Sequence, residues 1–567
     1  MSSTTNVKYP WLKEGIWPER APRSIDFSAE KRTLIDVFKE TTEKYPNKTF
    51  LYFAGNEFTF TDIWKQIQNL ATELSQKGVT KDDTIAILMP NLVQFVVGFF
   101  TAQYLGCIAS LLNPLHVSEE LLYHINDSKA TILLAHDFLY DKVYPIKDKT
   151  NLRLIVTTSA GDVLPGFKAF LGKKMGKIPQ GNVEDPTVLN WKKILAEGAK
   201  KPKVQPTKVD NKATALLIYT GGTTGVAKGA ELSHFNVISN CMAISNWTEE
   251  PITESDVFMG ALPFFHSFGM TVALIAATYF GSGLVLAPDP RDLPALLKAV
   301  QKHKVTYYPG VPAMYISLLN FKDTPKYDLS SIKFCFSGAA PLPVEVQKQF
   351  EALTGATMLE GYGMTELSPI ATSNPPGKTR IGSIGMPIPN TIVRIVDLET
   401  GNLLPLDQTG PDHIGEIVVS GPQVMKGYYN KPAESSSSLK EIDGIRYMHT
   451  GDIGYMDGDG YFFIVDRKKD MIIVSGYKVF PRDVEEAIYL HPAVKQVAVV
   501  GVPDERTTER VKAFIELKEG MTVTKEEMFK HCEEHLANYR RPKEIEFRSL
   551  GEFTTLVGKV LRRKLRE

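Results

Sequence analysis

Residues 84–112 read TIAILMPNLVQFVVGFFTAQYLGCIASLL. The stretch opens on the β-branched and apolar run Thr84-Ile85-Ala86-Ile87-Leu88 and closes on a second such run, Ile108-Ala109-Ser110-Leu111-Leu112. Between them, residues 92–104 form a longer apolar segment that favours a helix. A short strand, a helix and another short strand form the unit from which parallel sheets with helices on their faces are built. The stretch therefore predicts an α/β fold.

The same alternation continues from about residue 50 to about residue 380, after which the chain becomes rich in β-forming runs such as 391–396 (TIVRIV). The charged pentapeptide Asp466-Arg467-Lys468-Lys469-Asp470 then separates two apolar runs. Few contacts cross an exposed polar segment of this kind, which is typical of a domain boundary. We expect a large N-terminal domain of parallel sheets flanked by helices (1–466, with a small β-barrel-like subdomain at about 380–466), a hinge (467–470) and a small C-terminal α+β domain (471–567).

Residues 471–567 contain the signals of this small α+β domain. Pro481 can open a helix, because the first helical position needs no N–H partner. The run 497–500 (VAVV) favours a strand. Thr524-Lys525-Glu526-Glu527 is a capping box that predicts the start of a second helix.

Residues 158–212 interrupt the alternation with many Lys, Gly and Pro residues, and we interpret them as a long surface excursion or subdomain linker. Within this region, residues 164–177 (LPGFKAFLGKKMGK) interleave basic and apolar side chains. Such a pattern is typical of a segment that touches a membrane surface peripherally. A solvated, lysine-rich loop is the alternative.

Composition narrows the class of protein. A chain of 567 residues is too long for one hydrophobic core, and its 65 basic and 65 acidic side chains cancel, which argues against a nucleic-acid-binding surface over the whole molecule. The cysteines lie far apart without a CxxC spacing, so neither a zinc site nor a disulfide framework is indicated, and we expect a cytoplasmic protein. We expect no targeting segment. The most apolar stretches, 84–115 and 271–287, are interrupted by Pro or Gly and favour buried pieces over membrane spans.

A second decisive stretch, 219–229 (YTGGTTGVAKG), directly follows an apolar run. Glycines let backbone N–H groups converge on anionic oxygens, threonines add hydroxyl donors and a lysine adds a point charge. The residues concerned are Thr220, Gly221, Gly222, Thr223, Thr224, Gly225 and Lys228. The loop lacks the Gly-Lys-[Ser/Thr] of a Walker A motif, so P-loop chemistry is not supported. On its own, it predicts either a polyphosphate cradle or an ordinary surface turn.

Two later segments supply groups that a nucleotide needs. The segment 361–366 (GYGMTE) joins an aromatic face, a hydroxyl and a carboxylate, which suit a purine, a phosphate and a magnesium ion respectively. The segment 337–341 (SGAAP) has small residues that would let its backbone approach a flat base. Each is equally compatible with a turn after a strand.

Taken together, five segments resemble the core motifs of the adenylate-forming enzymes. In order, they are 219–229, 361–366, 449–454 (HTGDIG), 466–470 and Gly558-Lys559. Within that superfamily the chain looks most like the fatty acyl-CoA synthetases, and the resemblance covers roughly residues 30–567.

The resemblance assigns roles in nucleotide binding. It implies that Tyr362 stacks on adenine, Thr365 contacts the α-phosphate, and Glu366 with Thr220 binds Mg²⁺. Lys228 and the loop would hold the β- and γ-phosphates. Asp452 and Arg467 resemble the pair that holds the ribose hydroxyls; without the resemblance, both are ordinary turn and surface charges. The remaining nucleotide-binding positions that it implies are Gly338, Ala339, Ala340, Gly361, Gly363 and Met364.

The C-terminal motifs imply a moving catalytic group. Lys559 would be the catalytic lysine, delivered when a mobile C-terminal domain swings about the hinge residue Lys469, although a lysine near a chain end is usually just solvated. This chain has Phe553 and Thr554 where the family usually has a proline and a basic residue, which leaves the shape of the loop open.

The segment 263–269 (PFFHSFG) resembles the family's acyl-channel segment, with ordinary aromatic core as the alternative. His266, Gly310 and Gly338 are the positions that the resemblance places near the acyl substrate, and we expect His266 to be a packing and orienting group.

The implied reaction has two halves: a fatty acid of medium or long chain attacks the α-phosphate of Mg-ATP to give acyl-AMP, and coenzyme A then displaces AMP. The resemblance thus implies Mg²⁺, ATP, a fatty acid and CoA as small-molecule partners, and we add a homodimer as an expectation. The alternatives are a ligase for aryl or short-chain acids, a luciferase-like oxygenase, a carrier-protein-loading ligase, and a non-catalytic adenine-nucleotide-binding protein.

Overall fold

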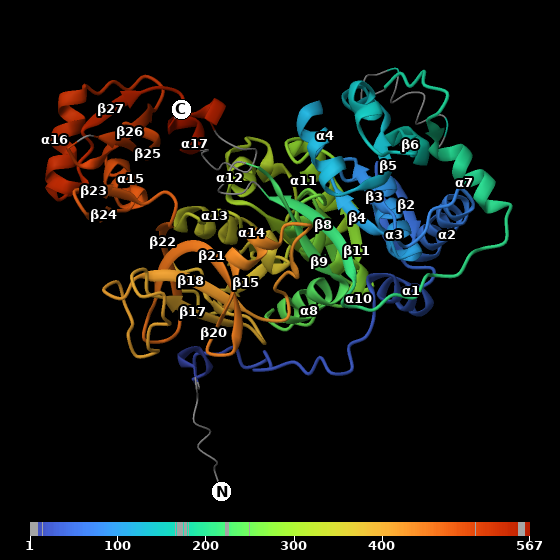
Figure 1. Ribbon diagram of the computed structural model, residues 1–567, viewed down its shortest axis with the longest axis horizontal. Helices are drawn as coiled ribbons and strands as arrows, with labels where there is room; N and C mark the ends of the chain where they lie inside the picture. The colour runs from blue at the N-terminus through green and yellow to red at the C-terminus, as the bar shows by residue number, and fades with distance from the viewer. Residues whose placement is uncertain are drawn as a thin grey trace, which may run out of the picture.

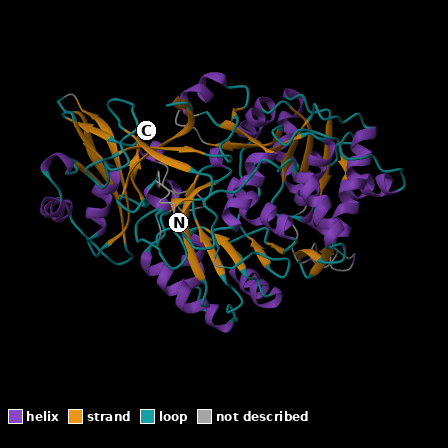
Figure 2. Cartoon of the chain, turned by 90° about the horizontal axis from the view of Figure 1, so that it is seen from below, coloured by secondary structure: helices purple, strands orange, loops and turns teal. Residues whose placement is uncertain are grey.

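The computed structural model describes residues 9–13, 15–164, 166, 174, 179, 181–220, 226–248, 250–504, 506–553 and 562–566. Two large sheets, one smaller antiparallel sheet and a separate C-terminal sheet form the scaffold (Figure 1). Helices surround the strands of the two large sheets (Figure 2). The expected α/β class is therefore confirmed.

The first large sheet is eight-stranded and contains the two strands of residues 84–112. Strand β3 pairs in parallel with β4 on one side and β5 on the other, while β8 and β9 form an antiparallel pair at one end. In spatial order the strands are β19 (Gly427–Tyr428), β9 (Lys228–Ser233), β8 (Thr214–Thr220), β4 (Ile108–Leu111), β3 (Thr84–Leu88), β5 (Ala130–His136), β6 (Leu154–Thr158) and β7 (Leu189–Asn190).

The second large sheet has nine strands, and its central six run parallel. In spatial order they are β16 (Met386–Pro387), β15 (Ile370–Ser373), β14 (Thr357–Gly363), β13 (Phe334–Ser337), β12 (Tyr307–Gly310), β10 (Val257–Gly260), β11 (Gly283–Leu286), β1 (Thr49–Phe53) and β2 (Asn56–Thr59). The carboxyl ends of parallel strands in such sheets are the usual place for a ligand.

Helix α3 (Val93–Leu105) forms the centre of the core. Every one of its residues is buried, and its rings contact Phe38 of α1 and Phe264 of the segment that follows β10. A helix that is apolar on all sides packs inside a domain, so the hydrophobic stretch around residue 100 is a core element. No helix among the residues described is long and apolar enough to cross a membrane.

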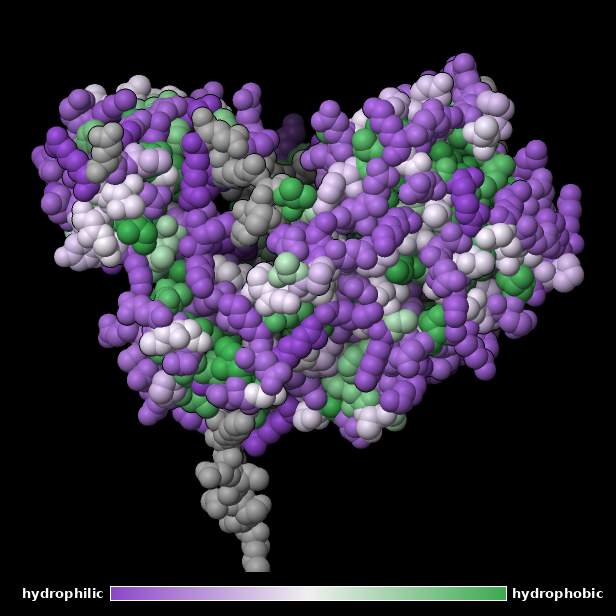
Figure 3. Space-filling model, viewed as in Figure 1, coloured by the Kyte–Doolittle hydropathy of each residue, from purple (hydrophilic) through white to green (hydrophobic). Residues whose placement is uncertain are grey.

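The other α-helices of residues 1–466 lie between and around the strands. They are α1 (Leu34–Lys44), α2 (Phe60–Gln76), α4 (Ser118–Asp127), α5 (Tyr140–Val143), α7 (Trp191–Ala199), α8 (His234–Ser245), α9 (Ser267–Gly269), α10 (Ala276–Phe280), α11 (Leu293–His303), α12 (Pro312–Asn320), α13 (Val344–Thr354) and α14 (Pro432–Ser438). The face seen in Figure 3 is mostly hydrophilic, with apolar residues scattered over it.

The region 158–212 differs from the expected excursion, because it contains β7 and helix α7. Trp191 and Ile194 of α7 are buried, and Gly198 lies so close to α2 that a Cβ there would meet the Asn69 carbonyl oxygen at 2.0 Å. In the sequence Gly198 looks like a helix breaker, whereas in the structure it permits close packing of two helices. Of the segment 164–177, only residues 164, 166 and 174 are described.

The β-rich subdomain is a five-stranded antiparallel sheet. Its strands are β17 (Ile392–Val396), β18 (Gly415–Ser420), β21 (Ile445–Met456), β20 (Leu439–Ile442) and β22 (Phe462–Arg467), with β22 on β21. The N-terminal segment crosses beneath this sheet before it reaches α1 (Figure 1). It is held there by Trp11, which packs against Phe462, and by the Ile25 N–H, which donates to the Asn390 side chain at 2.7 Å.

The C-terminal part has its own sheet and its own apolar core. The strands are β24 (Tyr477–Val479), β23 (Ile472–Val474), β26 (Thr508–Leu517), β25 (Val494–Asp504) and β27 (Glu544–Phe547), and the helices are α15 (Pro481–Tyr489), α16 (Lys525–His535) and α17 (Arg562–Arg566). Pro481 opens α15 and Thr524 caps α16 with the predicted capping box. The expected α+β character of this part is thus confirmed.

Candidate active site

The predicted positions Gly310, Gly338 and Gly361 lie at the carboxyl ends of neighbouring parallel strands. Gly310 ends β12 and pairs with Ser337 of β13, which pairs with Glu360 of β14. A Cβ on Gly338 would lie 3.3 Å from both the Gly361 carbonyl oxygen and the Phe268 ring. Close packing against Phe268 is thus one reason for a small residue at position 338, and an approach of this backbone to a flat base stays a prediction.

Gly310 also has a packing reason to be glycine. A Cβ there would lie 2.9 Å from the ring of Tyr315, which is fully buried and donates its hydroxyl to the Tyr308 and Phe336 carbonyl oxygens. The role of Gly310 toward an acyl group stays a prediction.

Glu360 was missed by the sequence reasoning. Burial raises the pKa of its carboxyl to about 7, although the Leu342 N–H donates to it at 3.1 Å and opposes that shift. Near neutral pH this group can therefore both accept and donate a hydrogen bond at the strand edge.

Tyr362, Asp452 and Arg467 form one cluster. The Tyr362 hydroxyl donates to Asp452 Oδ2 at 2.6 Å, and Arg467 Nε lies 2.9 Å from Asp452 Oδ1. Asp452 and Arg467 are cross-strand partners on β21 and β22, and Asp452 is only 3% exposed. Because each carboxylate oxygen has two lone pairs, Asp452 can still accept hydroxyl donors from a ligand.

The Glu366 carboxylate contacts side chains of two other segments. Thr220 donates its hydroxyl to Glu366 Oε1 at 3.2 Å, and the Tyr428 hydroxyl donates to the same oxygen at 2.8 Å. Within the described ranges no residue donates to Glu366 Oε2. A buried carboxylate with one committed and one open oxygen fits a Mg²⁺ ligand, since Mg²⁺ takes few protein carboxylates and several phosphate or water oxygens.

Lys228 lies near Tyr428, which holds this carboxylate, with Nζ 5.2 Å from the centre of the Tyr428 ring. It pairs across the β8–β9 hairpin with Thr220. One end of the predicted phosphate loop therefore contacts Glu366 and the other lies against Tyr428, whereas Gly221, Gly222, Thr223, Thr224 and Gly225 lie outside the described residues. Tyr428 was missed because nothing in its sequence context indicates that it contacts Glu366.

Thr365 and His266 adjoin this site. The buried Thr365 hydroxyl lies 3.3 Å from the Ser267 hydroxyl at the start of α9. His266 Nδ1 accepts the Phe268 N–H at 3.3 Å, which fixes the orientation of an exposed imidazole. An accepting nitrogen carries no proton, so Nδ1 is the unprotonated nitrogen in this contact, and the role of His266 toward the acyl substrate stays a prediction.

At the predicted hinge, Lys469 is exposed and the Asp470 N–H donates to the Arg467 carbonyl oxygen. The neighbouring Lys468 is paired with Glu416 at 3.0 Å. Lys559 and Gly558 lie outside the described residues.

The carboxylates that flank the hinge both reach Arg562 of α17. Arg562 Nη1 lies 3.5 Å from Asp466 Oδ1 and 3.4 Å from Asp470 Oδ2, while Nη2 binds both oxygens of Glu485 at 2.7 and 2.8 Å. Asp466 also accepts the Arg482 N–H at 2.8 Å. The segment that follows Lys559 is thus fixed to the hinge region by a network of buried charges.

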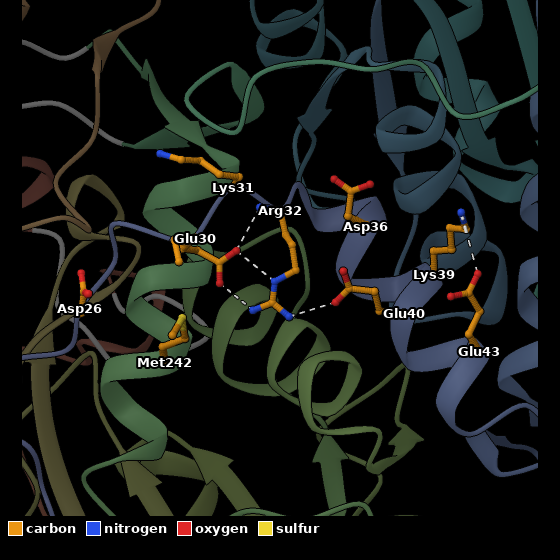
Figure 4. A pocket seen from close by; sticks show the side chains of 10 residues that line it. Asp26, Glu30, Lys31, Arg32, Asp36, Lys39, Glu40, Glu43 and Met242 are labelled. Atoms are coloured by element: carbon orange, nitrogen blue, oxygen red, sulfur yellow. Dashed lines mark hydrogen bonds and ion pairs between the residues drawn. The ribbon is translucent and has the colours of Figure 1, made fainter.

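A hollow of about 700 Å³ lies elsewhere, beside α1 (Figure 4). Its central guanidinium, Arg32, is already bonded to Glu30, Glu40 and the Tyr279 hydroxyl. This hollow contains none of the predicted site residues, and its central guanidinium is already paired.

Comparison with known proteins identifies the family. The model of the AMP-binding enzyme family matches residues 38–429, and the model of the AMP-binding enzyme C-terminal domain matches residues 483–552. The chain belongs to the AMP-binding enzyme family. The motifs that predicted adenylate chemistry therefore lie in a chain of that family.

Relatives of this AMP-binding enzyme match over nearly its whole length. A long-chain-fatty-acid–CoA ligase of Bacillus subtilis (strain 168) is 39% identical, with 98% of each chain covered, and one of Yersinia pestis is 36% identical, with 98% of this chain and 97% of the relative covered. Among solved structures, the anthranilate CoA ligase AuaEII in complex with anthranoyl-AMP superposes with a TM-score of 0.79 at 27% identity, covering 94% of this chain and 97% of that one.

Proposed function

We propose that this AMP-binding enzyme is a fatty acid–CoA ligase. It converts ATP, a medium- or long-chain fatty acid and CoA into AMP, diphosphate and acyl-CoA. The observation that carries the proposal is the convergence of Thr220, Lys228 and Glu366 at one point of the fold. The full-length relatives named long-chain-fatty-acid–CoA ligase support the substrate class.

In the first half-reaction, the fatty acid carboxylate attacks the α-phosphorus of ATP and diphosphate leaves. Glu366 and Thr220 would hold Mg²⁺, which when bound neutralises charge on the phosphates. Lys228 and the loop it closes would bind the leaving diphosphate, while Tyr362, Thr365 and the edge at Gly338 and Gly361 hold the adenosine and the α-phosphate. Asp452 and Arg467 would orient the ribose.

In the second half-reaction, the CoA thiolate attacks the acyl carbonyl and AMP leaves. We propose that residues 471–567 turn about Lys469 between the two steps, which withdraws Lys559 and brings 476–478 toward the thiol. The exposure of Lys469 and the separate apolar core of the C-terminal part support this movement.

Lys559→Ala tests whether Lys559 acts only in the first half-reaction. Acyl-AMP formation, read as acid-dependent pyrophosphate exchange, should fall by roughly 100-fold or more, because one preorganised cation is lost. Conversion of supplied acyl-AMP to acyl-CoA should be largely intact. Lys564→Ala, an exposed lysine on α17, is the matched control and should change neither step. Equal loss in both half-reactions would show that Lys559 does not act in the first step alone.

A ligase for aryl acids is the second candidate, because the structural relative AuaEII is an anthranilate CoA ligase. The two proposals differ in the acid that supports exchange. A binding protein without activity would show no exchange with any acid.

We further propose a peripheral membrane contact through residues 164–177 and a homodimeric assembly. The side chains of Leu115 and Val117, each 59% exposed, would offer a further apolar surface. Sedimentation with anionic vesicles, compared between the wild type and Phe170→Glu, tests the first proposal: loss of binding in the variant supports it, and equal binding contradicts it. The mass of the protein in solution tests the second.

A further inference from the structure

Asp127, the last residue of α4, accepts hydrogen bonds from side chains of two other segments. Its Oδ2 accepts the Tyr219 hydroxyl at 3.0 Å, and its Oδ1 lies 2.8 Å from Lys431 Nζ. The Tyr123 hydroxyl lies 3.3 Å from Oδ1. The Asp127 side chain is 8% exposed, so solvent screens these contacts little.

Tyr219 and Tyr123 hold the two ends of the predicted phosphate loop. Tyr219 directly precedes Thr220 on β8. Tyr123 donates its single hydroxyl proton to the Ala227 carbonyl oxygen at 2.8 Å, directly before Lys228 on β9. The Asp127 cluster therefore fixes Tyr219, directly before Thr220, and Ala227, directly before Lys228.

Lys431, the other donor to Asp127, links this cluster to Glu366. Lys431 follows closely after Tyr428, whose hydroxyl holds Glu366, and the Lys431 N–H donates to the Tyr428 carbonyl oxygen at 3.1 Å. An ammonium group beside the last turn of α4 also suits the negative end of the helix dipole.

Packing holds the Tyr219 ring in one place. It stacks on His124 with ring centres 4.2 Å apart, and a Cβ on Gly229 would lie 3.2 Å from it. His124 is neutral at physiological pH, because burial and the neighbouring His116 lower its pKa to about 4. The ring therefore cannot turn away to another partner without opening this contact.

We propose that Asp127 is a positioning residue for the triphosphate of ATP, which fixes Thr220 through Tyr219 and Glu366 through Lys431. The inference rests on the proposed function only for the identity of the nucleotide. It assigns to Asp127 an effect on the β- and γ-phosphates and none on the adenosine.

The test compares affinities for MgATP and for AMP in Tyr219→Phe and Asp127→Asn. Each variant should weaken MgATP binding by roughly 10- to 100-fold while AMP binding is unchanged, since a small displacement of positioned groups is costly. The double variant should be no worse than Asp127→Asn alone, because the two side chains act through one contact.

The same domain offers a matched control. Tyr140 donates to Asp185 at 2.8 Å, and Lys147 pairs with the same carboxylate, so Tyr140→Phe removes an equivalent hydroxyl that makes no described hydrogen bond to the β8–β9 hairpin. Tyr140→Phe should leave both affinities unchanged.

Equal weakening of MgATP and AMP, or no weakening of either, would overturn the inference, as would additive losses in the double variant. The wild type separates this inference from the proposed function. If it binds MgATP but supports no exchange with any acid, the proposed function fails and the affinity ratio still decides the role of Asp127.

Discussion

Single side chains around Glu366 determine how its carboxylate is presented. Oε1 receives two hydroxyl donors, Thr220 and Tyr428, and no residue in the described part of the chain donates to Oε2. The distribution of donors therefore gives the carboxylate a fixed rotation, which a metal ligand needs.

Tyr428→Phe removes one of these donors without changing the ring beside Lys228. We expect acid-dependent pyrophosphate exchange to fall about tenfold, because a hydrogen bond to a charged group contributes roughly 1.5–3 kcal/mol. The apparent Mg²⁺ requirement should rise in parallel. Tyr429→Phe is the control, since the described contact of Tyr429 uses its backbone N–H. Equal effects of the two variants would contradict this role of the Tyr428 hydroxyl.

The Glu416 carboxyl makes the free energy of unfolding depend on pH. Although burial opposes ionisation, His449 and Lys468 lower its pKa to about 2. A carboxyl with a depressed folded pKa stabilises the protein above its unfolded pKa of 4.5, and this stabilisation is lost as the pH falls from there toward 2.

We therefore expect Glu416→Gln to lower the free energy of unfolding by roughly 3 kcal/mol at neutral pH. The difference from the wild type should shrink as the pH falls below about 4.5. Denaturant unfolding at a series of pH values measures it. Glu399→Gln, which removes an exposed ion pair with Lys478, should show almost no difference. A constant gap between wild type and Glu416→Gln would rule out the assigned pKa.

At the scale of elements, the α7–α2 contact shows what a sequence pattern misses. Lys, Gly and Pro in 158–212 indicated a surface excursion, yet Asn190 caps α7 and its apolar face is buried. Gly198→Ala would push a methyl group against the Asn69 carbonyl oxygen, so we expect a destabilisation of about 1–3 kcal/mol from overpacking. Thermal unfolding measures it, with the exposed Ala199→Ser as the control. An unchanged melting temperature would contradict the close packing.

Strands, by contrast, were predictable wherever short apolar runs alternated with helical segments. β3, α3 and β4 lie where residues 84–112 predicted them, because burial on both faces requires continuous apolar residues. The site was predictable only in part. Glu366, Thr220, Asp452 and Arg467 are recognisable as motifs, whereas Tyr428 and Asp127 join the site through tertiary contacts between residues 62 and 92 positions apart.

At the scale of the whole molecule, the two lobes meet at the carboxylates around Arg562. Asp466 precedes Lys469 in the chain while Asp470, Glu485 and Arg562 follow it, so the proposed rotation about Lys469 would separate Asp466 from the other three. These contacts favour the orientation seen in Figure 1.

Lys469→Pro should stiffen this junction. Within the described structure the Lys469 N–H donates to no partner, so proline restricts the φ angle without removing a known hydrogen bond. We expect thioester formation from supplied acyl-AMP to slow more than adenylation does. Lys469→Ala, which removes the charge but not the freedom, should retain both rates. If Lys469→Pro leaves the ratio of the two rates unchanged, the hinge lies elsewhere.

The central claim is that one site activates a fatty acid with ATP and passes the acyl group to CoA. The most direct measurement is the rate of AMP release with ATP, Mg²⁺ and CoA over straight-chain acids of increasing length, with benzoate and anthranilate included. The account predicts equal amounts of AMP, diphosphate and acyl-CoA, with the highest rates for medium- or long-chain acids. Highest rates with the aryl acids, or no AMP release with any acid, would contradict it.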